Sequence, residues 1–235
     1  LYYIGNNPLV NVEENQNTWM QYVGGQRIGV AVAKSIEDLI NGSYKKPSEP
    51  LIIPDNINTF HRVVNPSVAQ TPDGNFLMMF KSSSQQNGHG HMTHWIAKAE
   101  NPDGPFKLVG PVFTDAEYSA EDPYFWYDKK RKKFFAIVKD FSKSGKLTPQ
   151  FGALALITSK DGIHEWRPAE NSLVSLRQYL KGSDDTIKLA HLERPQLLLD
   201  EEGQPLVLYA AASERSPFQI DDPVKEGKPE YNTFN

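Results

Sequence analysis

The stretch DPYFWYDKKRKKFFAIV (residues 122–138) decides the fold, because it has two counterparts elsewhere in the chain. They are NPSVAQTPDGNFLMMF (65–80) and RPQLLLDEEGQPLVLY (194–209). Each copy opens on a residue followed by proline, runs on as a strand, turns, and enters a second apolar strand. Repeats spaced by roughly 50 to 70 residues are typical of stacked supersecondary units. The chain is therefore predicted to be a repeat architecture built from β-hairpins.

The repeats extend beyond these hairpins. Alternating apolar and polar residues, the pattern of a half-buried strand, recur in GVAVAKS (29–35), HWIAKAE (94–100) and LALITSK (154–160). A fourth, outer strand fits after the last two of them. Four antiparallel strands per unit make the blade of a β-propeller. We therefore predict an all-β fold of this class.

The predicted blades belong to one domain, residues 1–235. Leu1 falls where the second strand of a blade would begin, so the inner strand of that blade is expected upstream of it. We expect a five-bladed β-propeller truncated at the N-terminus, with about four blades in this chain, two of them incomplete. The blades are predicted at roughly 1–55, 60–114, 120–171 and 190–235.

Helical patterns are weak in this chain. Only SIEDLIN (35–41) and SLVSLRQYLK (172–181) have apolar residues at helical spacing. Each of the two segments is predicted to form one to three helical turns.

Composition excludes several classes of function. The net charge is −4, which gives no electrostatic reason to expect a nucleic-acid partner. The chain has no cysteine, so disulfides, thiolate metal sites and a cysteine nucleophile are excluded. No run of 18 apolar residues is present, so no membrane insertion is expected.

Two acids stand at or beside the repeated prolines, Asp122 and Glu193. A repeat that places carboxylates at equivalent strand starts gathers them at one centre. The structural alternative is that they cap strands or pair with Arg194 and Lys139. By strand alternation, Glu121 is expected to point away from Asp122, and Arg194 away from the central funnel.

Further candidates for substrate contact lie close to these acids in the repeat. Asn65 is the non-acidic counterpart of Asp122, and an amide there suits recognition of a sugar hydroxyl. Arg62 precedes it at the entry of the same inner strand. Trp126 lies further along its own inner strand, where aromatic residues pack between blades or stack on a sugar face.

Histidines form a separate pattern. His89, His91 and His94 have a His-x-His-x-x-His spacing that could bind zinc. However, His91 and His94 would point to opposite faces of a strand, so we assign no metal site and place His91 in the sugar pocket. His191 lies two residues before Glu193 and shares its face, so it is a further candidate for substrate binding.

At these residues the sequence resembles five-bladed β-propeller glycoside hydrolases, closest to family 43 and its relatives, including family 117. The motifs are LYYIGNN (1–7), SAEDPYFWYD (119–128), SKDGIHEW (159–166) and HLERPQLLLDEEGQPLVLYAA (191–211). The blade pattern extends the resemblance over nearly the whole chain.

The resemblance implies three carboxylates at the central funnel: an Asp base on the first blade, an orienting Asp, and a Glu acid. Asp122 resembles the second and Glu193 the third. No Asp here occupies the first-blade motif, so the base is expected upstream of Leu1, unless the protein is a non-standard member. In family 117 a histidine near the last carboxylate is implicated as the acid. By this resemblance His191 is a candidate for the same role.

The expected function is therefore inverting hydrolysis of glycosidic bonds in plant or algal oligosaccharides. Glu193 would be the general acid and Asp122 would orient and tune. No cofactor is required, although the resemblance allows a divalent cation in the central channel. It also favours a periplasmic or extracellular location. The alternatives are a catalytically inactive carbohydrate-binding propeller, and an enzyme that transfers the glycosyl group to phosphate or another sugar.

Overall fold

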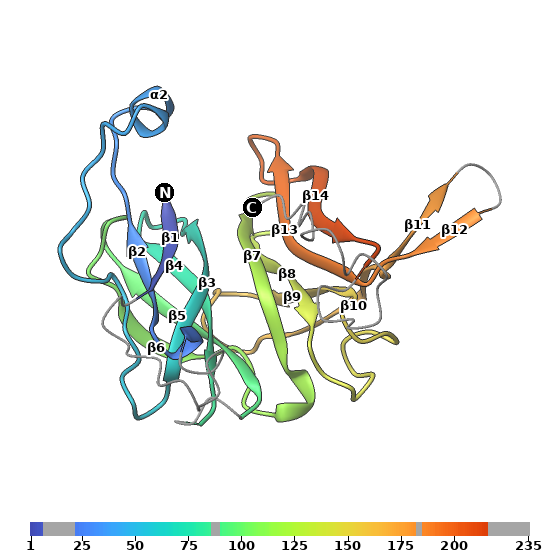
Figure 1. Cartoon of the computed structure of the whole chain (residues 1–235). Coiled ribbons are helices and arrows are strands. Elements are labelled where there is room, and N and C mark those ends of the chain that lie inside the picture. Colours follow the sequence, from blue (N-terminus) through green and yellow to red (C-terminus); the bar gives the residue numbers. More distant parts are fainter. Residues whose placement is uncertain (7–21, 86–89, 182–184, 216–235) are drawn as a thin grey trace, which may run out of the picture.

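The computed structural model describes residues 1–6, 22–85, 90–181 and 185–215, and strands dominate this part of the chain. Two four-stranded antiparallel sheets form its centre (Figure 1). The first complete blade contains β3 (Phe60–Gln70), β4 (Phe76–Ser83), β5 (Met92–Ala99) and β6 (Lys107–Pro111). The second contains β7 (Ala120–Asp128), β8 (Lys133–Asp140), β9 (Leu154–Ser159) and β10 (Arg167–Ser175). In both, sequence order and spatial order are the same, as in a propeller blade.

Two further hairpins flank the complete blades. One pairs β1 (Tyr2–Asn6) with β2 (Gln26–Val30), and the other pairs β13 (His191–Leu199) with β14 (Pro205–Ser213). Strand β1 contacts β3, β3 contacts β7, and β7 contacts β13, so these strands surround a common centre. A separate hairpin, β11 (Gln178–Lys181) and β12 (Asp185–Lys188), projects from the second complete blade (Figure 1). The predicted all-β propeller class is confirmed.

The main core lies between the two complete blades. Leu77, Met79 and Ile96 come from the first blade and are at most 1% exposed. They meet Phe125 and Phe134 of the second blade, whose rings stack with centroids 5.5 Å apart. Each such side chain contributes roughly 1.5 to 3 kcal/mol by leaving water. This packing holds the inner strands β3 and β7 side by side.

One predicted helix is present and the other is wrong. Helix α2 (Ile36–Ile40) begins after Ser35, whose Oγ accepts a hydrogen bond from the Asp38 N–H at 3.0 Å. Segment 172–181 instead forms the end of β10 and the whole of β11. Pairing with β9, in which Leu173 lies opposite Ala155, outweighs the weak helical preference of this segment. In addition, the Ser172 hydroxyl donates to the Leu147 carbonyl at 2.7 Å.

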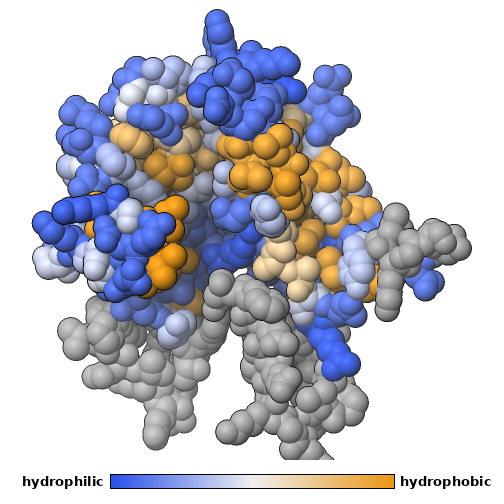
Figure 2. All heavy atoms as spheres, turned by 90° about the horizontal axis from the view of Figure 1, so that it is seen from above, coloured by the Kyte–Doolittle hydropathy of each residue, from blue (hydrophilic) through white to orange (hydrophobic). Residues whose placement is uncertain are grey.

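Apolar side chains are exposed on the surface beside the central hollow of the molecule (Figure 2). Strands β13 and β14 carry several large apolar side chains that are at least 38% exposed: Leu198, Leu206, Val207, Leu208 and Tyr209. Within the described ranges, no helix has the length and apolar character needed to cross a membrane. Segment 216–235, which belongs to the predicted last blade, lies outside the described residues.

Candidate active site

The three innermost strands share one irregularity at the repeated prolines. In β3, Val64 lies opposite Lys81 and Ser67 lies opposite Met79, so two residues, Asn65 and Pro66, face a single partner position. Strands β7 and β13 show the same register shift around Asp122-Pro123 and Arg194-Pro195. Each is a β-bulge, and proline suits it because proline has no N–H to lose from the ladder. The sequence repeat is therefore a repeat of bulges.

The bulges turn their first residue into the left-handed region of backbone space. The φ angles are 57° at Asn65, 53° at Asp122 and 54° at Arg194. Such angles are costly for residues other than glycine and cluster at functional sites. They also break the alternation of side chains along the strand.

Two predictions are corrected by this geometry. By register and φ, the counterpart of Asp122 is Arg194, whereas the counterpart of Glu193 is Glu121. The two predicted catalytic acids therefore do not occupy equivalent positions. Arg194 also does not point away from the centre, because its Nε lies 3.4 Å from Asp122 Oδ1.

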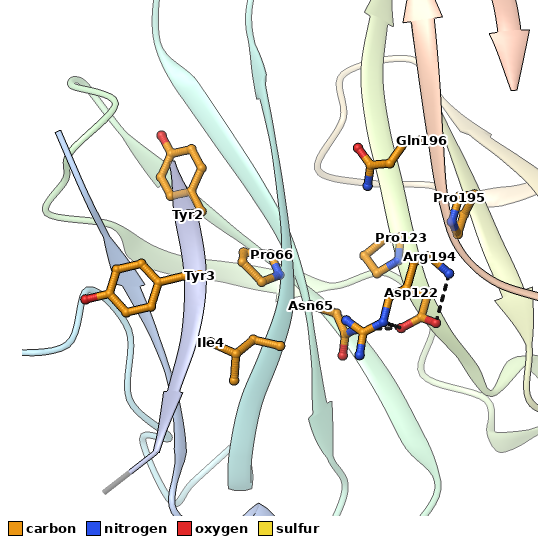
Figure 3. Close-up of a pocket in the computed structure, with 10 residues that line it drawn as sticks. All are labelled: Tyr2, Tyr3, Ile4, Asn65, Pro66, Asp122, Pro123, Arg194, Pro195 and Gln196. Atoms are coloured by element: carbon orange, nitrogen blue, oxygen red, sulfur yellow. Dashed lines mark hydrogen bonds and ion pairs between the residues drawn. The ribbon is translucent and has the colours of Figure 1, made fainter. Parts of the chain in front are cut away.

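The bulges line a cavity of about 200 Å³ between the inner strands (Figure 3). Its walls are the three residue–proline pairs, Gln196, and Tyr2, Tyr3 and Ile4 of β1. Asp122 lies at its end with Asn65 and Arg194 around it (Figure 3). Asn65 Nδ2 donates to Asp122 Oδ1 at 2.5 Å, and the Arg194 backbone N–H donates to Oδ2 at 3.2 Å. Glu193 does not line this cavity.

Asp122 is the buried acid of the candidate site, with 5% of its surface exposed. Burial raises its pKa, because a charged carboxylate loses its hydration. The Arg194 guanidinium opposes this effect, while the charges of Glu121 and Glu193 add to it. Asp122 and Glu193 therefore lie close enough to influence each other electrostatically, although their carboxylates have different immediate partners.

Glu193 belongs to a row of alternating charges, which we call the lysine–glutamate chain: Lys81, Glu121, Lys139 and Glu193. Lys81 Nζ lies 2.6 Å from Glu121 Oε2, and Lys139 Nζ lies 2.9 Å from Glu121 Oε1. Lys139 Nζ also lies 2.6 Å from Glu193 Oε1. The same Glu193 oxygen lies 3.2 Å from Nδ1 of His191. The chain thus crosses from the first complete blade to β13.

The pKa values in the lysine–glutamate chain follow from the ammonium groups of Lys81 and Lys139. Burial alone would raise the pKa of Glu121, but Lys81 and Lys139 lower it to about 2. Burial would also raise the pKa of Glu193, and the Lys139 ammonium instead holds it below its usual value. The pKa of Lys139 is raised, because the two carboxylates outweigh the effect of its burial. At neutral pH the Glu121 and Glu193 carboxylates and the Lys139 ammonium are therefore charged.

Exposure differs along the lysine–glutamate chain. The side chains of Lys139 and Glu121 are 7% and 14% exposed, whereas that of Glu193 is 33% exposed. The ion pairs of the structural alternative, Lys139 with Glu193 and Arg194 with Asp122, both form. They leave Glu193 accessible to a ligand from solvent.

The remaining predicted contact residues are spread around this centre. Arg62 Nη2 donates to Met92 Sδ at 3.4 Å, and burial lowers the pKa of its guanidinium while Glu121 opposes this. His191 joins the site through Glu193. His91 lines a second cavity, between the complete blades. Trp126 is only 6% exposed, stacks on Phe135 and lines neither cavity, so the predicted sugar contact is corrected to a core position.

The histidine pattern at 89–94 shows no metal site in the part that can be described. His94 is buried, and burial lowers its pKa to about 3, with Lys81 adding to the effect and Glu121 opposing it. His89 lies outside the described residues. Among the described residues, no three His, Asp or Glu side chains gather as they would around a metal ion.

Sequence reasoning missed Lys81 and assigned Glu121 only a structural part. The signal was present, because a lysine directly follows two of the repeated segments, at Lys81 and Lys139. Each lysine lies opposite the residue that precedes a bulge, namely Val64 and Glu121. In the third copy the residue that precedes the bulge is Glu193, and the residue opposite it is Ala211 instead of a lysine. Glu193 therefore takes its ammonium partner from the neighbouring blade.

Comparison with known proteins finds solved structures with a similar fold. No family model and no curated protein matches this chain. Similar solved structures include a glycosyl hydrolase from Bacteroides ovatus, with a TM-score of 0.51 and 16% identity over 92% of this chain. Another is exo-β-1,3-galactanase from Phanerochaete chrysosporium with β-1,3-galactotriose, with a TM-score of 0.50 and 13% identity over 81% of this chain.

This chain spans only part of these proteins, 63% of the first and 38% of the second. At such low identity the likeness concerns the path of the backbone and not individual side chains. It therefore supports the propeller fold and leaves the chemistry to the residues of this chain.

Proposed function

We propose that this chain is part of a propeller glycoside hydrolase that cleaves glycosidic bonds of plant or algal oligosaccharides with inversion. The observation that carries the proposal is the repeated bulge. It buries Asp122 at the axis and leaves Glu193, on the next inner strand, half-buried and open to solvent beside it. The two carboxylates therefore have different environments, which allows them to have different roles in the reaction. Two of the similar structures, a glycosyl hydrolase and an exo-β-1,3-galactanase, support the same proposal.

In this proposal Glu193 is the general acid that protonates the leaving oxygen. At rest the Lys139 ammonium keeps it ionised, while burial works in the opposite direction. A bound sugar that excludes water, or that draws Lys139 towards Glu121 alone, raises the pKa of Glu193. Substrate binding would then load the proton where it is needed.

Asp122 is proposed as the orienting carboxylate. Its Oδ1 and Oδ2 are held by Asn65 and the Arg194 backbone, so its position is fixed before substrate arrives. When ionised it stabilises positive charge developing on the sugar ring. An inverting mechanism also needs a general base roughly 6.5 to 9.5 Å from the acid, and the resemblance implies an aspartate of the first blade for this part.

The test is a pair of isosteric substitutions, Glu193→Gln and Asp122→Asn, with Glu201→Gln as an exposed control in the β13–β14 turn. Hydrolysis of a panel of aryl glycosides and oligosaccharides is measured, and the anomer first released is read by NMR. Loss of a positioned acid lowers kcat by roughly 100-fold to 10,000-fold. Undiminished activity in both site variants would refute the assignment.

Transfer to phosphate is the second candidate, and one observation favours it. The carboxylate of Glu121 interacts electrostatically with three cationic side chains, Arg62, Lys81 and Lys139. No carboxylate in the described ranges accepts a hydrogen bond from Arg62, which therefore has capacity to bind an oxyanion. Activity that requires inorganic phosphate and releases a sugar phosphate would select this candidate. Sugar binding without turnover would instead select an inactive carbohydrate-binding propeller.

A further inference from the structure

We propose that the cavity between the two complete blades is a subsite for a second sugar unit, with Phe141 as its stacking platform. We call it the Phe141 cavity, and the inference rests on the proposed function. It has a volume of about 490 Å³ and is lined by residues of segments 90–92, 116–119 and 141–144. Small-molecule sites typically occupy about 300 to 1,000 Å³. The space is therefore large enough for a sugar ring.

The loop that carries Phe141 is held in place by a buried acid. Asp140 is 1% exposed and accepts hydrogen bonds from the Ser142 N–H and hydroxyl, both at 2.9 Å. It also accepts from the Thr148 N–H at 3.1 Å and from the Thr148 hydroxyl at 2.7 Å. These four donors fix the course of the loop. A wall fixed in advance loses little conformational entropy when a ligand binds.

The floor of the Phe141 cavity ties the two blades together. The Met92 N–H donates to the Ser119 hydroxyl, and that hydroxyl lies 3.2 Å from the Met92 carbonyl oxygen. The Phe141 N–H donates to the Ser119 carbonyl at 2.9 Å. The cavity is thus bounded by backbone from both blades, and its shape does not depend on surface side chains alone.

Phe141 offers a partly exposed aromatic ring at this place. Its surface is 37% exposed and that of Phe151 is 39% exposed, and their ring centroids are 5.3 Å apart. No other phenylalanine in the described part is exposed to this degree. An exposed aromatic ring on a fixed loop suits the apolar C–H face of a sugar ring, which leaves the sugar hydroxyls free for polar partners.

A single ammonium group connects this platform to the proposed acid. Lys139 Nζ lies 5.7 Å from the centre of the Phe141 ring and 2.6 Å from Glu193 Oε1. The ring and the carboxylate therefore contact the same cation. A glycan whose scissile oxygen reaches Glu193 extends its next unit over Phe141. The enzyme is thus expected to prefer oligosaccharides over single-sugar glycosides.

Isothermal titration calorimetry tests the subsite without requiring turnover. The probes are a panel of plant and algal trisaccharides, β-1,3-galactotriose among them, each with its parent monosaccharide. We expect Phe141→Ala to weaken binding of the best trisaccharide about tenfold, because one stacked ring is lost. Binding of the monosaccharide should change less than about twofold. Phe141→Leu keeps the bulk, and Tyr209→Ala removes an exposed aromatic ring from β14 as the control.

The outcomes separate the subsite from the proposed activity. Equal trisaccharide affinity in Phe141→Ala and the native protein overturns the subsite, as does failure of every trisaccharide to bind the native protein. Loss of affinity in Tyr209→Ala as large as in Phe141→Ala also overturns it. If Phe141→Ala loses trisaccharide binding while Glu193→Gln keeps full hydrolysis, the subsite stands and the assignment of Glu193 falls.

Discussion

Replacing Lys139 by methionine tests the lysine–glutamate chain most directly. The substitution keeps an unbranched side chain that is one heavy atom shorter, and it removes the ammonium that joins Glu121 to Glu193. Glu121 retains Lys81 and Glu193 retains His191. The variant therefore leaves both carboxylates partly uncompensated. This is costly because Lys139 is buried and only 14% of the Glu121 side chain is exposed.

The magnitude follows from the pKa of Glu121. A folded value of about 2 against an ordinary value of 4.5 corresponds to about 3 kcal/mol of stability at neutral pH. Lys81 shares this effect, so Lys139→Met should lower the free energy of unfolding by about 2 kcal/mol at pH 7. The pKa of Glu121 is depressed in the folded protein, so its contribution is present above pH 4.5 and is lost as the pH falls towards 2. The penalty of the substitution should shrink over the same range.

Urea denaturation of both proteins at pH 7 and pH 3 measures this difference. Lys146→Met is the matched control, because Lys146 pairs with Glu117 at an exposed position and such pairs contribute little. An equal penalty at the two pH values, or a penalty no larger than that of the control, would show that Lys139 is not an electrostatic bridge.

The same variant tests the proposed acid through its pH profile. Without the ammonium, burial dominates and the pKa of Glu193 rises. A general acid with a higher pKa stays protonated to higher pH, so the alkaline limb of kcat/KM should move upwards. An unmoved alkaline limb in an active variant would exclude Glu193 as the acid.

Three further outcomes are expected from the bulges and turns. Asp122→Asn should stabilise the fold at pH 7 and not at pH 3. The pKa of Asp122 is raised in the folded protein, so its ionisation costs stability as the pH rises through the pKa of the unfolded state. Urea denaturation at both pH values measures this difference. Arg194→Gly should be more stable than Arg194→Ala by about 1 kcal/mol in thermal unfolding, since both remove the guanidinium and only alanine places a Cβ at φ 54°. Gly203→Ala should lower the free energy of unfolding by about 3 kcal/mol, because the added Cβ would lie 2.5 Å from the Tyr127 carbonyl oxygen. Gly74→Ala should lower it by only about 1 kcal/mol, because the added Cβ would lie in open space. Equal effects within either pair of variants would contradict the geometry.

Much of the fold was predictable because local patterns repeat. The residue–proline pairs at 65, 122 and 194 mark the inner strands, and the alternating segments mark the strands that follow. The short helix after Ser35 was predictable from its cap. The helix predicted at 172–181 was not formed, because pairing of Leu173 with β9 outweighed a weak local preference.

Sequence by itself determined which positions repeat on the inner strands: Asn65, Asp122 and Arg194 through their shared prolines, with Glu193 directly before Arg194. Their directions were decided only by the tertiary structure. Alternation along a strand holds while the ladder is regular, and a bulge with positive φ reverses it, so Arg194 turns towards Asp122. Similarly, Lys139 of β8 contacts Glu193 of β13 in the neighbouring blade. No local pattern encodes such a contact, because it depends on how separate sheets pack around one axis.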